Sequence, residues 1–423
     1  MRFSAPLLAI PLLISLSPRT ELTAQARPAS ASTRITADTI PVTVRWNRLV
    51  PKFADEAVAS RRAARKAAAG DSTALRRIAQ TPPPPFPFRV YTVLSIAQYG
   101  AANSAKDNRG ISVEAAIASA SAAALSEMFS DSAVRASIAR ELARDIERVP
   151  VASRTPEKMT VAKNLGEDVA RRVIAWAPVM NLVEPWNGTI PTGAGMWYSA
   201  RGVPPIGVNL AKSRVWLLDS ASQFRPAPPP AYGSATFNAA LEEVRRVARE
   251  RTPQQTEIAQ RWNSSDPWAM WNETASGMLS RKKVSETEAA RVLAVLNVAA
   301  SDAVIACFDA KYHYWTLRPS QADTTLALAD SVSLPNFPSY PSGHACSAGA
   351  FDAVLGHFFP LERAQFKRIA EEQAMSRLYG GIHYRFDNDG GLVLGRVVAL
   401  HDVERERRGG LNAWRTAAVA GKR

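Results

Sequence analysis

The sequence predicts an all-α protein made of two packed helix bundles. Apolar residues recur at helical spacing along most of the chain, and no segment has the alternating pattern of a strand. The chain has 423 residues, of which 46% are hydrophobic. A chain of this length exceeds what one small core accommodates, so two packed halves are expected.

The N-terminus, residues 1–26, is predicted to be a secretory signal peptide. Arg2 precedes the apolar run APLLAIPLLISL, and Ala24 and Ala26 provide the small residues of a cleavage site. The run is too short for a membrane anchor and contains two prolines. We therefore expect export to a periplasm or the extracellular space, with residues 27–45 forming a flexible polar segment.

The first bundle is expected within residues 46–180, and several of its helices are rich in alanine. The periodicity predicts helices at 46–70, 72–79, 88–105, 112–129, 132–147 and 155–177. Residues 181–233 then contain many prolines and glycines and three tryptophans, which indicates a long connection packed across the surface.

The second bundle is expected within residues 234–408, followed by a polar tail at 409–423. The periodicity predicts helices at 234–250, 253–263, 267–281, 285–315, 343–359, 362–376 and 389–407. The run VLAVLNVAASDAVIACFDA is the best candidate for a membrane span, but it contains Asn297, Asp302 and Asp309. We therefore predict a buried core helix there and no transmembrane span.

One internal echo favours two related bundles. RVYTVLSIAQYGA, starting at Arg89, and RVLAVLNVAASDA, starting at Arg291, agree at six positions without a gap. Two unrelated amphipathic helices drawn from few residue types would give the same agreement. If the echo reflects a repeat, the fold is a pair of related helix bundles.

The net charge of +14 suggests an anionic partner. The basic residues are scattered among acids, as in EEVRRVARERTPQQTE, which is typical of a solvated helix face. This pattern and the expected export argue against nucleic acid and favour a small anionic substrate. The two cysteines, Cys307 and Cys346, permit either one disulfide or two buried thiols.

Three short segments of the C-terminal half concentrate cationic groups. In KYHYWTLRP, Lys311 and Arg318 are seven residues apart, which on one helix places both on the same face. In PSGH, a proline- and glycine-containing loop meets a predicted helix start at Ser342, Gly343 and His344.

The third segment is SRLYGGIHYRFD, which contains Arg377 and His383. If His383 begins a helix, Asp387 lies one turn further and can reach its ring.

Together these segments can bind a tetrahedral oxyanion. Two arginines and a lysine can clamp its oxygens, and the helix start at Ser342 and Gly343 adds further donors. Of the two histidines, one can attack or coordinate the central atom and the other can move a proton. Asp387 is expected to orient the first.

The spacings K-x6-RP, PSGH and SR-x5-H-x3-D, in this order, resemble the signature of the type 2 phosphatidic acid phosphatase (PAP2) and vanadium haloperoxidase superfamily. The segments PPPPFPFRVYTVLSIAQYGAANS and FRPAPPPAYGSATFNAALEEV are similar to the soluble bacterial haloperoxidase-like branch. The resemblance implies two four-helix bundles, as in vanadium chloroperoxidase, with the active site in the C-terminal bundle.

The resemblance also implies roles for the motif residues. His344 would be the acid–base, and His383 would coordinate vanadium or, in a phosphatase, be the phosphorylated nucleophile. The oxyanion, vanadate or phosphate, would be bound by Lys311, Arg318, Ser342, Gly343 and Arg377.

Two activities are compatible with this signature. A haloperoxidase would oxidise halide with hydrogen peroxide on a vanadate cofactor, whereas an exported acid phosphatase would hydrolyse phosphate monoesters without it. Length and the expected lack of membrane spans favour the haloperoxidase, as does Phe337, which matches a pocket phenylalanine of chloroperoxidases. Phe308 stands where chloroperoxidases have a tryptophan, which leaves the halide open. A non-catalytic phosphate- or vanadate-binding protein is a third alternative.

Overall fold

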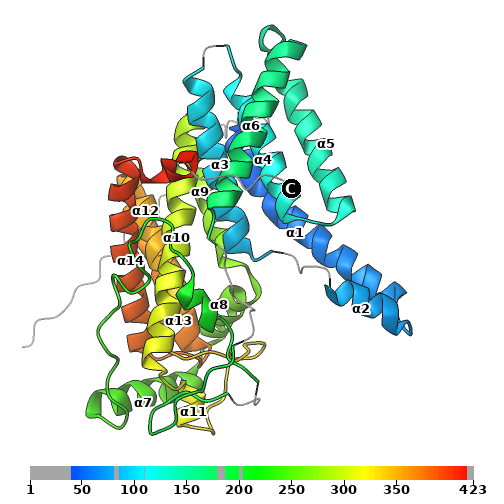
Figure 1. Ribbon diagram of the computed structural model, residues 1–423. Coiled ribbons are helices and arrows are strands. Elements are labelled where there is room, and N and C mark those ends of the chain that lie inside the picture. Colours follow the sequence, from blue (N-terminus) through cyan, green and yellow to red (C-terminus); the bar gives the residue numbers. More distant parts are fainter. Residues whose placement is uncertain (1–39, 81–84, 109, 179–185, 200–202, 417–423) are drawn as a thin grey trace, which may run out of the picture. The chain divides into compact units, whose positions relative to one another are not determined.

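The computed structural model describes residues 40–80, 85–108, 110–178, 186–199 and 203–416. The expected signal peptide, most of the segment 27–45 and the end of the polar tail lie outside the described residues. Within them the regular structure is helical, and an isolated bridge between Met196 and Thr316 is the only β pairing (Figure 1). The all-α prediction is therefore confirmed.

The N-terminal half packs α3, α4 and α6 together, with α1 and α5 alongside (Figure 1). Its helices are α1 (Val42–Ala67), α2 (Ser72–Gln80), α3 (Pro87–Lys106), α4 (Val113–Met128), α5 (Ser132–Arg148) and α6 (Pro156–Trp176).

The C-terminal half packs α10, α12, α13 and α14 together. Its helices are α7 (Ala235–Glu250), α8 (Pro253–Ser264), α9 (Pro267–Lys282), α10 (Glu286–Tyr314), α11 (Pro319–Ala322), α12 (Gly343–Phe358), α13 (Arg363–Tyr379) and α14 (Arg385–Arg407). Ala37–Arg423 form one compact unit. The exact domain boundaries given above stay a prediction.

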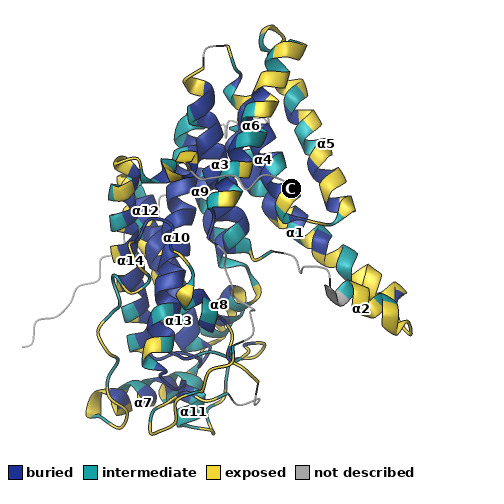
Figure 2. Ribbon diagram, viewed as in Figure 1, coloured by how far each residue is buried: buried dark blue, intermediate teal, exposed yellow. Residues whose placement is uncertain are grey.

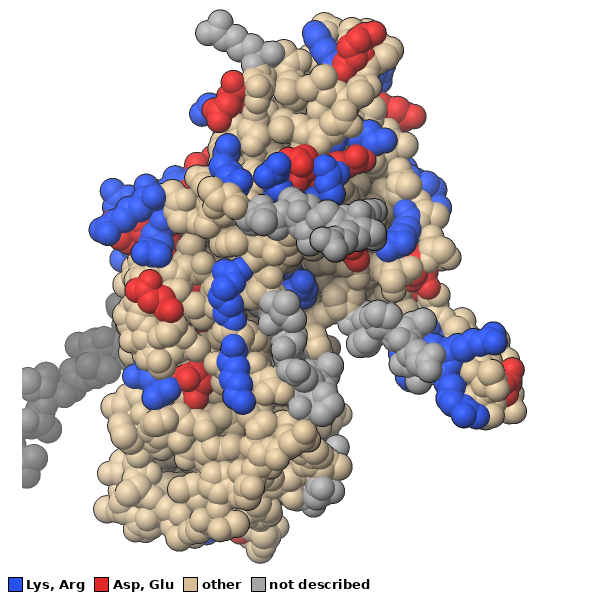
Figure 3. All heavy atoms as spheres, viewed as in Figure 1, with Lys and Arg blue, Asp and Glu red and all other residues tan. Residues whose placement is uncertain are grey.

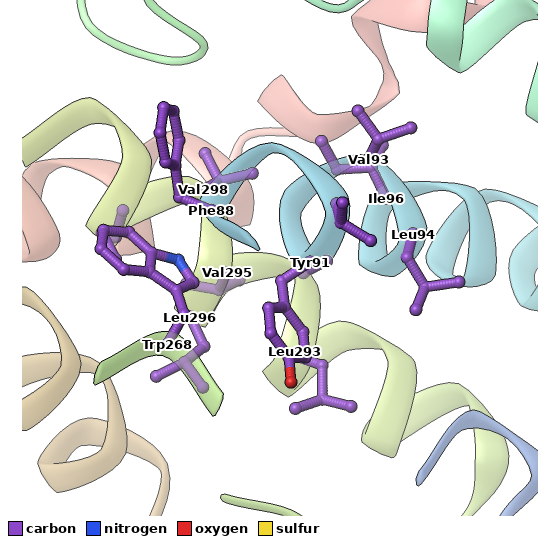
Figure 4. Packing of buried hydrophobic residues seen from close by; sticks show 14 of the residues in the cluster. Phe88, Tyr91, Val93, Leu94, Ile96, Trp268, Leu293, Val295, Leu296 and Val298 are labelled. Atoms are coloured by element: carbon purple, nitrogen blue, oxygen red, sulfur yellow. The ribbon is translucent and has the colours of Figure 1, made fainter. Parts of the chain in front are cut away.

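Helices α3 and α10 join the two halves along their length. They contain the two echo segments, and Figure 4 shows Tyr91 of α3 beside Leu293 of α10. Thr92 donates its hydroxyl to the Asn297 carbonyl at 3.1 Å, a direct bond between the two segments. The echo helices are thus packing partners at the centre of the core.

Helix α10 is the one described helix long and apolar enough to cross a membrane. Of its most apolar window, 89% is buried inside the protein, against helices on several sides (Figure 2). This environment is that of a core helix, as the polar residues within the run predict.

Two helices begin earlier than the sequence predicts. In each case a carboxylate accepts backbone N–H groups at the helix start, from a residue distant in sequence for α1 and from the helix itself for α14. Helix α1 starts at Val42 instead of residue 46 because the Glu286 carboxylate accepts the N–H groups of Val42 and Thr43. Helix α14 starts at Arg385 instead of residue 389 because the Asp387 carboxylate accepts the Tyr384 N–H at 3.0 Å.

Glycines let the backbones of α12 and α14 approach closely. A Cβ added at Gly349 would lie 2.4 Å from the Leu392 carbonyl oxygen, and one at Gly395 would lie 2.0 Å from that of Cys346. These distances are shorter than any real contact of such atoms. The close crossing fixes the N-termini of both helices, where the PSGH and His383 segments lie.

We predict that Gly395→Ala destabilises the protein by about 3 kcal/mol, because the added methyl group forces α12 and α14 apart. Thermal unfolding followed by circular dichroism measures the effect. Gly277→Ala on α9 is the matched control, since its nearest neighbour is the flexible Arg281 guanidinium at 3.2 Å. The control should be unchanged or slightly more stable. Equal melting temperatures for Gly395→Ala and wild type would contradict the close crossing.

Candidate active site

The candidate site lies where α10 ends and where α12 and α14 begin. Lys311, on the last turn of α10, is fully buried. Its ammonium donates to the carbonyls of Pro338 at 2.8 Å and Ser339 at 2.7 Å. An ammonium has three N–H bonds, so one remains for a ligand.

Arg318 reaches the site by a different path from the one predicted. Helix α10 ends at Tyr314, and Trp315 adopts a left-handed conformation with φ 50°. Arg318 is the N-cap of α11, so the expectation that it shares one helix face with Lys311 is wrong. The two cations meet because the chain turns at Trp315, where the Trp315 carbonyl accepts the Trp197 N–H at 2.6 Å.

The Arg318 guanidinium is held by backbone carbonyls. Nε donates to Phe337 at 3.0 Å and Nη1 to Ile382 at 2.8 Å. Nη2 is buried and has no hydrogen-bond partner. An unpartnered buried guanidinium nitrogen costs free energy, which a bound anion would recover.

Arg377, near the end of α13, is held in the same way. Its Nη2 donates to the Ala259 carbonyl at 3.1 Å, its Nε to the Ser376 hydroxyl at 2.9 Å, and its Nη1 to the Asn263 side chain at 3.4 Å. Among the described residues, none of the three cations forms an ion pair with a carboxylate.

Burial depresses the pKa of all three cations. The pKa of Lys311 falls to about 8, with Arg318 adding repulsion, and the pKa values of Arg318 and Arg377 fall to about 10. Each shift measures the cost of keeping a positive charge away from water. An anion placed among the three cations would offset that cost.

The PSGH segment forms the predicted loop-to-helix junction. Ser342 is the N-cap of α12, and its N–H donates to the Asp387 carbonyl at 2.9 Å. The Ser342 hydroxyl is buried without a partner and does not cap its own helix. A Cβ added at Gly343 would meet nothing within 4 Å, so open space lies beside this helix start.

His383 is buried and oriented by hydrogen bonds at both ring nitrogens. Its Nδ1 is 2.8 Å from Asp387 Oδ2, and its Nε2 is 3.3 Å from Arg318 Nη1. Because a guanidinium only donates, Nε2 must carry the lone pair, and the proton is therefore assigned to Nδ1. Burial and the Arg318 charge hold the pKa of His383 well below its usual value, so the ring is neutral.

Asp387 orients His383 without the predicted helical geometry. His383 precedes the helix, whose N-cap is Tyr384, and Asp387 in the first turn reaches back to the ring. Burial raises the pKa of Asp387 to about 6.

Ser339 is a site residue that the sequence analysis missed. Its hydroxyl is buried and donates to Asp387 Oδ2 at 2.5 Å, beside the His383 ring. Asp387 Oδ2 thus accepts from three donors, Ser339, His383 and the Tyr384 N–H. The available signal was the position of Ser339 two residues before Pro341, inside the proline-rich stretch.

His344 lies on the first turn of α12 and is partly exposed. Its Nε2 is 3.2 Å from the Trp262 carbonyl, which can only accept, so this nitrogen carries the proton and Nδ1 is free to accept another. Burial, followed by the charge of Arg377, lowers the pKa of His344 to about 3. The ring is therefore neutral without a ligand, and a bound anion beside it would raise its pKa and so its ability to accept a proton.

Helix α8 supports the site from outside, which no motif in the sequence indicated. Its C-terminal turns supply the Trp262 carbonyl to His344 and the Ala259 carbonyl to Arg377. The Trp262 indole is itself fixed by a hydrogen bond of 2.9 Å to Glu372 on α13.

The Phe337 ring covers two of the cations, and the Phe308 ring packs behind it. The Phe337 ring centre lies 5.0 Å from Lys311 Nζ and 5.0 Å from Arg318 Cζ, within the range of cation–π attraction. Phe308 packs against Phe337 with ring centres 5.4 Å apart. Both predicted pocket residues therefore form an apolar wall beside the clamp.

The two cysteines are free and buried. Cys307 lies one turn before Lys311 on α10, and its Sγ is 3.6 Å from the Pro341 carbonyl. Of the two alternatives left open by the sequence, the structure has buried thiols.

The three motifs therefore converge on one buried, positively charged site with a histidine lone pair facing a cation. The chemistry available is the binding of a small oxyanion, with nucleophilic or ligand character at His383 Nε2 and proton transfer at His344.

Comparison with known proteins places this site in a family. Residues 291–404 match the PAP2 superfamily. The superfamily predicted from the three motifs is thereby confirmed.

Two solved structures share the fold over most of their length. A bacterial vanadium-dependent iodoperoxidase aligns with a TM-score of 0.63 and 26% identity, over 76% of this chain and 91% of that chain. A bacterial vanadium-dependent chloroperoxidase aligns with a TM-score of 0.59 and 13% identity, over 77% and 93%. The predicted haloperoxidase-like architecture is thus confirmed.

Sequence relatives cover shorter segments. The vanadium-dependent bromoperoxidase of Ascophyllum nodosum is 31% identical over 101 residues, which are 17% of this chain and 18% of that enzyme. A lipid A 1-phosphatase of Rhizobium johnstonii is 39% identical over 64 residues, 15% of this chain and 26% of that enzyme. The chain therefore spans about a fifth to a quarter of the curated relatives it matches.

We predict that oxyanion affinity falls as the pH rises through the pKa of Lys311. Sulfate is a suitable probe because it stays a dianion between pH 6 and 9. Lys311 is charged below about pH 8 and neutral above it. The sulfate dissociation constant, measured by calorimetry, should rise about tenfold between pH 7 and pH 9, as one protonation event linked to binding requires.

Lys311→Met provides the control for this assignment. It should bind sulfate more weakly at pH 7 and lose the dependence between pH 7 and 9, because both histidines are already neutral there. A wild-type profile that is flat over this range would show that Lys311 does not contact the anion.

Proposed function

We propose that this PAP2 superfamily chain is a vanadate-dependent haloperoxidase, which oxidises halide with hydrogen peroxide. The observation that carries the proposal is the set of three buried cations, Lys311, Arg318 and Arg377, with no carboxylate paired to them among the described residues. Such a site needs an anion of high charge. The overall likeness to a vanadium-dependent iodoperoxidase supports vanadate as that anion.

The residues present fit vanadate. Arg318 Nη2 and the Ser342 hydroxyl are buried without partners, and the space beside Gly343 is open. The neutral imidazole of His383, with its lone pair on Nε2, is a good metal ligand, and Asp387 fixes its tautomer. The clamp, with Lys311 and Arg377, would bind the vanadate oxygens, and His383 Nε2 would be the ligand to vanadium.

Bound vanadate would supply a Lewis acid that activates hydrogen peroxide toward halide. The protein's own part is to hold charge and move protons. Lys311, Arg318 and Arg377 would offset the negative charge of the cofactor. His344 would accept a proton from peroxide at Nδ1, because Nε2 is committed to the Trp262 carbonyl, and would return it to the leaving oxygen.

The wall formed by Phe308 and Phe337 is proposed to set the halide environment. Phe337 lies over the cations and Phe308 packs against it, so a halide at this wall would be partly stripped of water. An apolar wall disfavours small, strongly hydrated halides. We therefore propose bromide or iodide as the better substrate.

A PAP2-type phosphatase is the second candidate, and the match to lipid A 1-phosphatases favours it. The His383 Nε2 lone pair could attack phosphorus while His344, protonated beside the bound dianion, protonates the leaving oxygen. Water would then hydrolyse the phosphohistidine. A binding protein without turnover is less well supported, because binding alone has no use for His344.

Export is part of the proposal and rests on the sequence alone. Arg2, the apolar run and the small residues at Ala24 and Ala26 have the order of a secretory signal. An exported enzyme would meet peroxide and halide outside the cytoplasm.

We predict that orthovanadate switches on halide oxidation in metal-stripped protein. One equivalent should restore iodide or bromide oxidation with hydrogen peroxide, read as triiodide or tribromide absorbance. Hydrolysis of an aryl phosphate is assayed in parallel. Phosphate hydrolysis that needs no vanadate and is inhibited by it, without any halide oxidation, would instead establish the phosphatase.

We predict that the two histidines can be separated by substitution. His383→Ala should abolish vanadium incorporation, measured by the metal content of the purified protein, because the ligand nitrogen is lost. His344→Ala should retain most incorporation but lose at least 100-fold in turnover, as expected for an acid–base group. His313→Ala is the control, since His313 is exposed on α10. Full activity in His344→Ala would reject its role.

A further inference from the structure

A cavity lies in the proline- and glycine-rich connection, which is bonded to the segments that carry Arg318 and Phe337. Described residues between Trp186 and Pro205 line a volume of about 550 Å³. This volume is in the range of pockets that bind small organic molecules. Its wall includes Trp186, Met196, Trp197 and Tyr198, and no charged residue is among its described lining. We call it the aromatic pocket.

Backbone hydrogen bonds fix the aromatic pocket to the segment that carries Arg318. The Leu317 N–H donates to the Gly195 carbonyl at 3.0 Å, and the Trp197 N–H donates to Trp315 at 2.6 Å. The Trp315 ring packs on both Trp186 and Trp197, with ring centres 5.8 and 6.1 Å apart. The pocket and Arg318 are therefore parts of one braced unit.

One loop links the wall of the aromatic pocket to the anion site. Asn336 borders the pocket through hydrogen bonds of 3.0 Å to the Ser199 side chain and the Pro204 carbonyl. The next residue, Phe337, lies over Lys311 and Arg318. Asn336 and Phe337 are consecutive, so the loop that bonds to the wall of the aromatic pocket continues directly into the residue that covers the cations.

The surroundings favour an uncharged ligand. Figure 3 shows few charged side chains on the visible face of the end of the molecule that carries α7 and α11. Residues on and near the pocket expose apolar side chains, and Met196, Tyr198, Val203 and Ile206 are each between 37% and 49% exposed. Burying an ionic group in such a pocket would cost free energy that no partner offsets.

We propose that the aromatic pocket binds a neutral, planar aromatic molecule, such as a phenol, as the organic acceptor of the oxidised halogen. The lining rings offer stacking and edge contacts, and Ser199 and Thr192 offer hydroxyls at the rim. The hydrogen bonds that join the pocket wall to the segments of Arg318 and Phe337 would hold the acceptor near the site where the oxidant forms.

The inference rests on the proposed function for its chemistry. Halide, hydrogen peroxide and one proton give hypohalous acid and water, with two electrons passing from halide to peroxide. The electrophilic halogen then forms a carbon–halogen bond on the ring. The ring loses its proton, which leaves with the hydroxide of the hypohalous acid as water. Binding of the acceptor itself needs neither vanadate nor halide and is tested separately.

The test uses 2-naphthol, which is neutral at pH 7, as the probe. Its binding and its halogenation are measured in two assays on the full chain. Calorimetry gives its affinity for vanadate-free protein, and product analysis gives kcat/KM for its halogenation by the vanadate-loaded protein. Met196→Asp, which adds a charge to the neutral wall, should weaken binding at least tenfold and lower kcat/KM by a similar factor. Triiodide formation in the same variant should stay within twofold of wild type.

Two further variants make the result interpretable. Met196→Gln keeps the side-chain length and should lose less affinity than Met196→Asp, which guards against a folding defect. Leu361→Asp adds the same charge at a side chain that is 89% exposed, far from the pocket in sequence, and should change neither assay. Equal 2-naphthol affinity in Met196→Asp and wild type overturns the pocket assignment. Absence of all halide oxidation in the wild type, with 2-naphthol binding intact, overturns the proposed function instead.

Discussion

The candidate active site depends on three buried cations, Lys311, Arg318 and Arg377, that have no carboxylate partner among the described residues and are held by backbone carbonyl oxygens instead. Five residues provide these carbonyls: Phe337, Pro338, Ser339 and Ile382 lie on loops, and Ala259 lies within α8. Carbonyl dipoles fix the direction of an N–H group without cancelling its charge. The positive field therefore remains available to a ligand, and the loops that supply the carbonyls must be held rigidly. Gly195, Trp197, Pro204 and Ile206 of the connection contribute to this by bonding to Leu317, Trp315 and Asn336.

The close packing of α12 against α14 fixes the position of the site relative to the core. Gly349 and Gly395 allow backbone contact that any larger residue would prevent, and this close crossing lies below the helix starts at Gly343 and Arg385. Ser342 and Asp387 then connect the two starts directly through a backbone hydrogen bond of 2.9 Å. His344 lies on the first turn of α12 and His383 lies just before α14, so steric contact between the two helices sets the relative position of both histidines.

Much of the fold and the site could be predicted from the sequence. The proximity of Arg318 to Lys311 is predicted from a helix geometry that the structure does not have, and the supporting residues are not predicted. Helical periodicity identifies most helices, and three motifs mark the clamp and both histidines. Arg318 lies beside Lys311 because of a left-handed residue at Trp315, which periodicity cannot reveal. Ser339 and Trp262 act through a hydroxyl and a backbone carbonyl. A carbonyl belongs to every residue, so Trp262, 82 positions from His344, leaves no signal in the sequence.

The support that α8 gives to the site has a consequence for how such enzymes diversify. Its last two turns contact both His344, for which we propose proton transfer, and Arg377, for which we propose anion binding. A small rotation of this one helix would shift both groups together while leaving every motif residue in place. Selection acting on the α8 interface with Glu372 could therefore retune the balance between oxidative and hydrolytic chemistry. Chains with identical signatures would then differ in reaction, and helix α8 would be the place to compare them.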